Sequence, residues 1–263
     1  MVYMMKFALS YIEQGFSIVP LESRSKSRFL TEHGFNDASK DREQVIKWFQ
    51  RWPNANIAIA TGEKSKGLIV LDFDLKPDLD INGLDYLREW ERQNGELPPT
   101  IEVISASGGT HLYYQSDLVV DSTQGLFDST SGVDIRGEGG CIIAPPSIGP
   151  SGKRYIFECS SYDNGLARAD DQVFKFIIDG MQYKKEQKIA NGNRFTLPEQ
   201  ILQGERDDVM FRLACSLLAK GVDDEKALML MFQVNQENCL PPLPEHTIRK
   251  KLKSALRLRE KGR

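Results

Sequence analysis

The chain has 263 residues, of which 40% are hydrophobic and 27% charged, with a net charge of −3. This composition is typical of a soluble globular protein, and the length allows one sizeable domain plus a small one. The four cysteines lie far apart without a C-x-x-C pair, which argues against a disulfide framework and a zinc knuckle. Because there is no run of about 18 apolar residues and no signal-peptide pattern at the start, we expect a cytoplasmic protein with no membrane partner.

The N-terminal segment predicts a helix followed by a strand. Apolar residues at helical spacing in 7–12 precede Gly15, which is typical of a helix end. The apolar run 16–19 predicts a strand that Pro20 should end. The polar segment that follows carries basic residues between 24 and 28. It is predicted to be a surface loop, although a basic loop could also meet phosphates.

Two carboxylates close the next apolar run, at 67–74. In a strand, alternate side chains share a face, so Asp72 and Asp74 should project together, about 6 to 7 Å apart at their bases. Phe73 should then point into the core. Such a pair can hold one or two divalent ions together with substrate phosphates. The competing interpretation, a solvated turn at a strand end, has about equal weight on this pattern alone.

A calcium-loop pattern follows the acidic strand. The residues that match it are Asp78, Asp80, Asn82, Gly83 and Glu89. An EF-hand needs a helix before its loop, whereas a β-branched strand and Pro77 precede this one. The pattern therefore favours a polar turn that begins a helix reaching about Asn94.

A loop of small residues joins the strand predicted at 100–104 to one that begins at His111. Glycine lets backbone N–H groups approach an anion closely, and serine hydroxyls add donors. The loop is therefore a candidate triphosphate cradle with His111 as a further donor; its residues are Ser105, Ser107, Gly108 and Gly109. A plain β-hairpin with a satisfied histidine is the alternative.

A second polar pair lies on the strand predicted near 133–136. Asp134 and Arg136 alternate with apolar residues, so one acid and one base should share a face. The alternative is a surface ion pair. A last strand is predicted at 153–157, after a Gly-Pro-Ser-Gly turn.

Beyond a helix at about 169–187 and a polar linker at 191–193, the apolar period changes from two to 3.6. Three helical stripes predict a small bundle, so we divide the chain into domains 1–190 and 191–263. The end of the chain is basic. Its candidate nucleic-acid contacts are Arg249, Lys250, Lys253 and Arg257, although a solvated helix face is an equally good interpretation.

Three of these pieces, taken together and in this order, resemble the primase-polymerase (prim-pol) domain of the archaeo-eukaryotic primase superfamily. They are Asp72-Phe73-Asp74, Ser107-Gly108-Gly109-Thr110-His111 and Val133-Asp134-Ile135-Arg136. The helical tail is similar to the primase C-terminal domain. The resemblance implies an α+β, RRM-like catalytic domain, with mixed and antiparallel sheets and flanking helices, followed by a small all-α bundle.

The resemblance also implies a DNA primase or DNA polymerase, a nucleotidyltransferase that makes or extends primers when a plasmid, phage or mobile element replicates. Asp72, Asp74 and Asp134 would bind two Mg²⁺ or Mn²⁺ ions, and His111 would contact the nucleotide phosphates. Ser107, Gly108, Gly109 and Arg136 would line the nucleotide site. The implied partners are a single-stranded DNA template, NTPs or dNTPs, and a helicase in trans or in a longer chain; no zinc is expected.

Two other function classes remain open from the sequence. A non-catalytic replication adaptor could use the helical bundle to bind DNA or to recruit a helicase. A nuclease could use the same pair of metal ions for hydrolysis.

Overall fold

The computed structural model describes residues 3–128, 130–190 and 195–261. The chain divides into two compact units, residues 1–187 and 188–263. Each is described here by itself. The linker predicted at 191–193 lies outside the described residues.

The first unit alternates short helices and strands. Its α-helices are α1 (Tyr3–Glu13), α2 (Arg42–Arg51), α3 (Gly83–Asn94) and α4 (Asp171–Ala190), and its 3₁₀ helices are η1 (Gly34–Asp37), η2 (Glu63–Ser65) and η3 (Pro77–Leu79). Its strands are β1 (Ser17–Leu21), β2 (Asn56–Ala60), β3 (Leu68–Phe73), β4 (Leu75–Lys76), β5 (Ile81–Asn82), β6 (Ile101–Ile104), β7 (Thr110–Gln115), β8 (Val133–Arg136), β9 (Cys141–Ala144), β10 (Ile156–Cys159) and β11 (Ala167–Arg168).

Two sheets organise this unit. The smaller is antiparallel, with strand order β1-β2-β9. The larger has the order β10-β6-β7-β3-β8, all antiparallel, and β11 adds to β7 in parallel. Strand β3 is therefore interior and has β7 on one side and β8 on the other.

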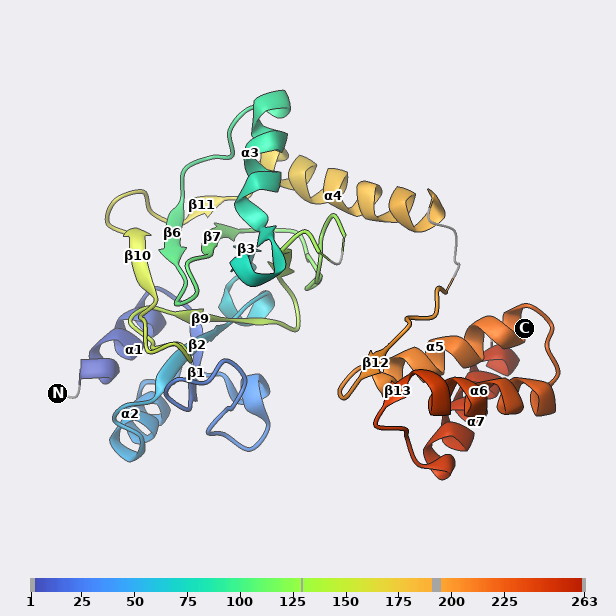
Figure 1. The fold of residues 1–263 in the computed structure, drawn as a ribbon. Helices are drawn as coiled ribbons and strands as arrows, with labels where there is room; N and C mark the ends of the chain where they lie inside the picture. Colours follow the sequence, from blue (N-terminus) through green and yellow to red (C-terminus); the bar gives the residue numbers. More distant parts are fainter. Residues whose placement is uncertain (1–2, 129, 191–194, 262–263) are drawn as a thin grey trace. The chain divides into compact units, whose positions relative to one another are not determined.

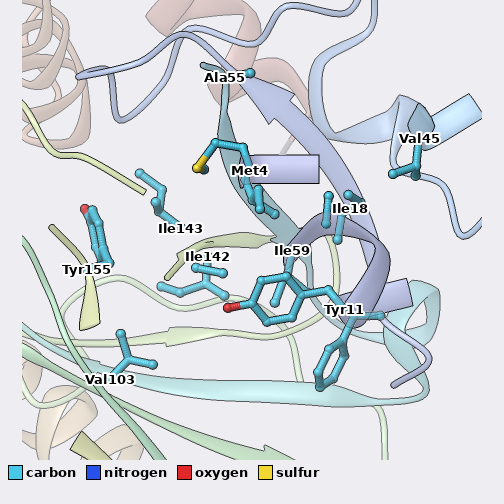
Figure 2. Packing of buried hydrophobic residues seen from close by; sticks show 14 of the residues in the cluster. Met4, Tyr11, Ile18, Val45, Ala55, Ile59, Val103, Ile142, Ile143 and Tyr155 are labelled. Carbon is cyan, nitrogen blue, oxygen red and sulfur yellow. The ribbon is translucent and has the colours of Figure 1, made fainter. Parts of the chain in front are cut away.

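The apolar core lies on both faces of the large sheet. One cluster joins α1, α2, the small sheet and the face of the large sheet that carries Val70 and Val103. Figure 2 shows part of it, with Tyr11, Ile59, Val103 and Ile142 close together. A second cluster joins the opposite face, including Phe73, to α3 and α4, which lie beside this sheet in Figure 1. Phe73 thus points into the core, as predicted.

Two strand predictions need correction. Strand β1 does not end at Pro20 but continues to Leu21, because β1 is an edge strand of its sheet and the missing N–H is tolerated there. Strand β10 begins at Ile156 rather than at residue 153. The preceding Tyr155 instead donates its backbone N–H to the carbonyl of Ser147, within its own turn.

The calcium-loop pattern folds as a hairpin before a helix. Strands β4 and β5 pair around η3, and α3 follows from Gly83 to Asn94. The predicted polar turn and helix are thus present. No helix precedes the loop in this part of the described chain, since β3 and β4 come immediately before it.

The second unit is a small helical bundle. It consists of α5 (Arg206–Ala219), α6 (Asp224–Asn238) and α7 (Glu245–Lys261), with a two-residue parallel pair of β12 (Ile201–Leu202) and β13 (Cys239–Leu240). Met210, Met231 and Ile248 are fully buried at its centre. The predicted fold class, α+β with flanking helices and then a helical bundle, is confirmed. Among the described residues, no helix is long and apolar enough to cross a membrane.

Candidate active site

The site is built on three adjacent strands of the large sheet. Asp72 on β3 lies directly opposite His111 on β7 and directly opposite Asp134 on β8. Residues opposite each other in antiparallel strands share a face. The three polar side chains therefore form a row across the sheet, on the face that meets the first core cluster. Asp72 and Asp134 are about sixty residues apart in the sequence, and the pairing of β3 with β8 brings them together.

Arg136 joins the two acids of this row. Its Nε and one terminal nitrogen donate to Asp72 Oδ2 at 3.2 and 3.0 Å, and the same terminal nitrogen donates to Asp134 Oδ2 at 2.8 Å. The Arg136 side chain is 28% exposed, so these ion pairs are partly shielded from water. The alternation predicted for Asp134 and Arg136 is therefore present, and it places the guanidinium between two carboxylates.

Asp74 follows β3 directly and extends the acidic cluster. Its backbone N–H donates to the carbonyl of Gly132, and its own carbonyl accepts from the N–H of Gly83. Its carboxylate accepts a 2.7 Å hydrogen bond from Lys76 Nζ. The two predicted carboxylates of β3 thus have different partners, Arg136 for Asp72 and Lys76 for Asp74.

The pKa of Asp134 responds to its burial and to the charged groups around it. Burial raises the pKa of Asp134, and the charges of Asp72 and Asp74 add to this rise, whereas the Gly125 N–H and the charge of Arg136 oppose it. Burial also opposes ionisation of Arg136, yet the two carboxylates that it binds raise its pKa. The cluster is therefore an electrostatically coupled group of acids and bases.

His111 is almost completely buried, and burial lowers its pKa below the usual value despite the nearby charge of Asp72. This shift favours the neutral imidazole. Its Nε2 lies 3.4 Å from Asp72 Oδ1, a close approach rather than an ion pair in this state. A neutral imidazole can still donate one hydrogen bond to an anion.

The loop predicted as a phosphate cradle is the tight turn between β6 and β7. The Ser105 N–H donates to the Gly109 carbonyl, and the Ser105 and Ser107 hydroxyl oxygens are 3.1 Å apart. Ser107 and Gly108 are exposed at the tip. Gly109 has a packing role that the sequence did not reveal, since a Cβ there would lie 2.3 Å from the Phe73 carbonyl oxygen. The turn is thus pressed against the end of β3, beside Asp74.

The donor chemistry of the acids suits a hard divalent cation, because Mg²⁺ and Mn²⁺ prefer carboxylate oxygens. The arrangement of the side chains, in contrast, does not suit such a cation. Within residues 3–128, 130–190 and 195–261, no group of three or more His, Cys, Asp or Glu residues is placed to hold a metal ion. The carboxylates are instead occupied by Arg136 and Lys76.

Three residues near the site were absent from the predicted set. Lys76 contacts Asp74, and its position two residues later in an extended chain could have indicated this. The Tyr155 ring lies 5.9 Å from the His111 ring, and burial, with Asp72 and Asp74, raises its pKa to about 12. Tyr155 belongs to the cluster in Figure 2. Lys26, in the basic loop after β1, lies close enough for its charge to lower the pKa of His111.

The basic residues predicted for nucleic-acid contact lie in the second unit, on α7. Arg249, Lys250, Lys253 and Arg257 are all exposed. At 100° per residue they fall within about 100° of the helix circumference, opposite the stripe that the core buries. None of them forms an ion pair with a described acidic side chain. Two neighbours on α7 do, since Lys251 pairs with Asp207 and Arg259 with Asp224.

The first unit brings a row of acids, a histidine and an arginine together on one sheet, and a helical bundle follows it. This combination of fold and residues defines the class of primase-polymerases. The model of the family "Bifunctional DNA primase/polymerase, N-terminal" matches residues 8–171, and the model "Primase C terminal 1" matches residues 196–260. The chain belongs to the bifunctional DNA primase/polymerase family.

Among solved structures, a crystal structure of primase RepB' aligns with 95% of this chain and 94% of its own, at 14% identity and a TM-score of 0.37. No match is found among curated proteins.

Proposed function

We propose that the first unit is a template-directed nucleotidyltransferase that makes or extends primers from NTPs or dNTPs on single-stranded DNA. The observation that carries this proposal is the row His111, Asp72, Asp134 across three adjacent strands, in a chain of the primase/polymerase family. Phosphoryl transfer of this kind needs positioning and charge stabilisation rather than a covalent nucleophile. The row supplies fixed acids and a neutral donor at one place.

The acids would hold the divalent ions and the bases would contact phosphate. Asp72, Asp74 and Asp134 are the proposed ligands of Mg²⁺ or Mn²⁺, which when bound polarise phosphate oxygens and lower the pKa of the attacking hydroxyl. Arg136 has the planar donor set that suits phosphate oxygens. Neutral His111 is a hydrogen-bond donor toward the same anion.

The turn between β6 and β7 is the proposed cradle for the nucleotide triphosphate. Its exposed tip offers the Ser107 hydroxyl and the N–H groups around Gly108, and it is fixed to β3 through Gly109. Backbone N–H groups in such turns bind anions without steric obstruction. Ser105 is buried beneath the tip and its hydroxyl lies beside that of Ser107, so it is placed to orient this donor.

The second unit is the proposed template contact. Four exposed cations, which form no ion pair with a described acidic side chain, extend along one face of α7: Arg249, Lys250, Lys253 and Arg257. Lysine and arginine along one helix face neutralise phosphates of a nucleic-acid backbone. In this proposal the first unit is the enzyme and the second contacts the DNA template. Unwinding of a duplex would need a helicase, in trans or in a longer chain.

A primer-synthesis assay on single-stranded DNA, run separately with NTPs and dNTPs, tests the function. We expect Asp72→Asn with Asp74→Asn to lower nucleotide incorporation at least about a hundredfold, because several kcal/mol of transition-state stabilisation depends on these acids. Asp85→Asn with Glu89→Gln on α3 is the matched control, since it removes two exposed carboxylates that pair only with their own helix.

Incorporation that survives the Asp72 and Asp74 changes in folded protein would contradict the assignment. Cleavage of labelled DNA with Mn²⁺ and no nucleotides would favour the nuclease. DNA binding without any incorporation by the unchanged chain would favour the adaptor.

A further inference from the structure

The acids of the site are neutralised by the protein's own cations. Arg136 binds Asp72 and Asp134, and Lys76 Nζ binds Asp74 Oδ2 at 2.7 Å. The Lys76 ammonium group therefore lies directly on one of the three carboxylates that are proposed as metal ligands.

The two cations differ in how easily they can leave. Arg136 makes hydrogen bonds to two carboxylates and its side chain is 28% exposed. The Lys76 side chain is 48% exposed and has one carboxylate partner, on a neighbouring residue. An exposed lysine ion pair contributes only about 0.2 to 1 kcal/mol. Lys76 is thus the weakly held cation of the cluster.

The backbone under this ion pair is fixed. A Cβ on Gly109 would lie 2.3 Å from the Phe73 carbonyl oxygen, and one on Gly132 would lie 3.2 Å from the Asp74 carbonyl oxygen. Two backbone hydrogen bonds, with Gly132 and Gly83, hold Asp74 on both sides. Asp74 can therefore exchange Lys76 for another cation by rotation of the side chains alone, without any rearrangement of the strand.

We propose that Lys76 is an internal counter-ion that competes with the divalent metal for Asp74, and that metal binding displaces its ammonium group toward solvent. The inference rests on the proposed function, because it takes Asp74 as a metal ligand. It accounts for the occupied state of Asp74, whose carboxylate has the donor chemistry that suits a divalent cation; Arg136 occupies the other two carboxylates. Lys76 would keep the metal-free acids from repelling one another and would lower the affinity for metal by the free energy of its own ion pair.

Binding of Mn²⁺ alone to the full chain, measured by the electron paramagnetic resonance signal of free Mn²⁺, tests the competition without any assay of activity. We expect Lys76→Met to lower the Kd for Mn²⁺ about threefold to fivefold, which corresponds to loss of one exposed ion pair. Lys76→Arg keeps a competing cation and should bind Mn²⁺ like the unchanged chain. The gain should diminish as salt rises, because exposed ion pairs are screened.

Lys26→Met is the matched control. It removes one positive charge near His111, but Lys26 has no ion pair with a described acidic side chain. A smaller change with Lys26→Met than with Lys76→Met supports competition. Equal changes in both variants, or no change with Lys76→Met, overturn it.

Asp72→Asn with Asp74→Asn separates this inference from the proposed function. If that variant loses Mn²⁺ binding while Lys76→Met leaves the Kd unchanged, the metal ligands are supported and only the competition fails. If the variant binds Mn²⁺ as tightly as the unchanged chain, the proposed metal site itself is wrong.

Discussion

At the scale of single residues, the site depends on how closely backbone segments approach the end of β3. Gly109 is the clearest case, since a Cβ would lie 2.3 Å from the Phe73 carbonyl oxygen and 3.3 Å from Asp74 Cα. Both neighbours are backbone atoms, one at the end of buried strand β3 and one in the next residue, which two backbone hydrogen bonds hold in place, so neither can move aside cheaply. The absent side chain is therefore what lets the β6–β7 turn lie against Asp74.

We predict that Gly109→Ala lowers the free energy of unfolding of the first unit by about 1 to 3 kcal/mol, the usual cost of an added methyl group in a closely packed place. Tryptophan fluorescence during urea unfolding measures this, because all three tryptophans, Trp48, Trp52 and Trp90, lie in the first unit. Ser107→Ala, at the exposed tip of the same turn, should change the value by about 0.5 kcal/mol or less. Equal stability of the two variants would show that the turn accommodates the added methyl group without loss of stability.

At the scale of elements, α7 has two distinct faces. Ile248, Leu252 and Ala255 are buried in the bundle core, whereas the four proposed DNA contacts are exposed. Arg249 also lies over the Phe232 ring at 5.2 Å, which limits its range of positions. Lys251 and Arg259 form ion pairs, so the cations of α7 that have no such pair among the described side chains lie on one face of the helix.

We predict that Lys250→Glu with Lys253→Glu weakens binding of single-stranded DNA and lowers the slope of log K against log salt by about 1.4, or about 0.7 for each lost phosphate contact. Fluorescence anisotropy of labelled DNA at several salt concentrations measures the slope. Lys220→Glu with Lys226→Glu makes the same change of charge at exposed positions of the same unit and should leave the slope nearly unaltered. An unchanged slope for the α7 variant would indicate a merely solvated helix face.

At the scale of the whole molecule, the two units have separate cores. The clusters of the first unit contain residues from Met4 to Ile177, and the cluster of the second contains residues from Phe195 to Leu256. Units that share no core residues unfold as separate cooperative blocks. The second unit is also small, and domains of this size bury little of their surface and are marginally stable.

We therefore predict two thermal transitions for the full chain, the lower belonging to the second unit. A fragment of residues 1–190 should keep the midpoint of the full chain, measured by tryptophan fluorescence, within about 2 °C. Far-ultraviolet circular dichroism of the full chain should show both transitions, because both units contain helices. A single transition by both probes, or a fragment with a lower midpoint, would show that the units stabilise each other.

Local patterns in the sequence predicted most of the elements. The alternation at Asp72 and Phe73 predicts side chains on opposite faces of a buried strand, and β3 has this arrangement, because period two is a property of any extended chain. The helical stripe with Ile248 and Leu252 likewise predicts α7. Predictions were wrong where pairing decides the outcome, as at Pro20, which is tolerated because β1 is the edge strand of its sheet.

The sequence by itself determined which residue types are available for the chemistry: acids and a histidine on strands, a loop of small residues, and a basic helix at the end. Only the tertiary structure decided what each of them contacts. The β3–β8 register sets Asp134 opposite Asp72, and packing sets Gly109 against Phe73. The same pairing places Arg136, 64 residues away in the sequence, on the carboxylate of Asp72. Such contacts join residues far apart in the chain or depend on burial, and local spacing encodes neither.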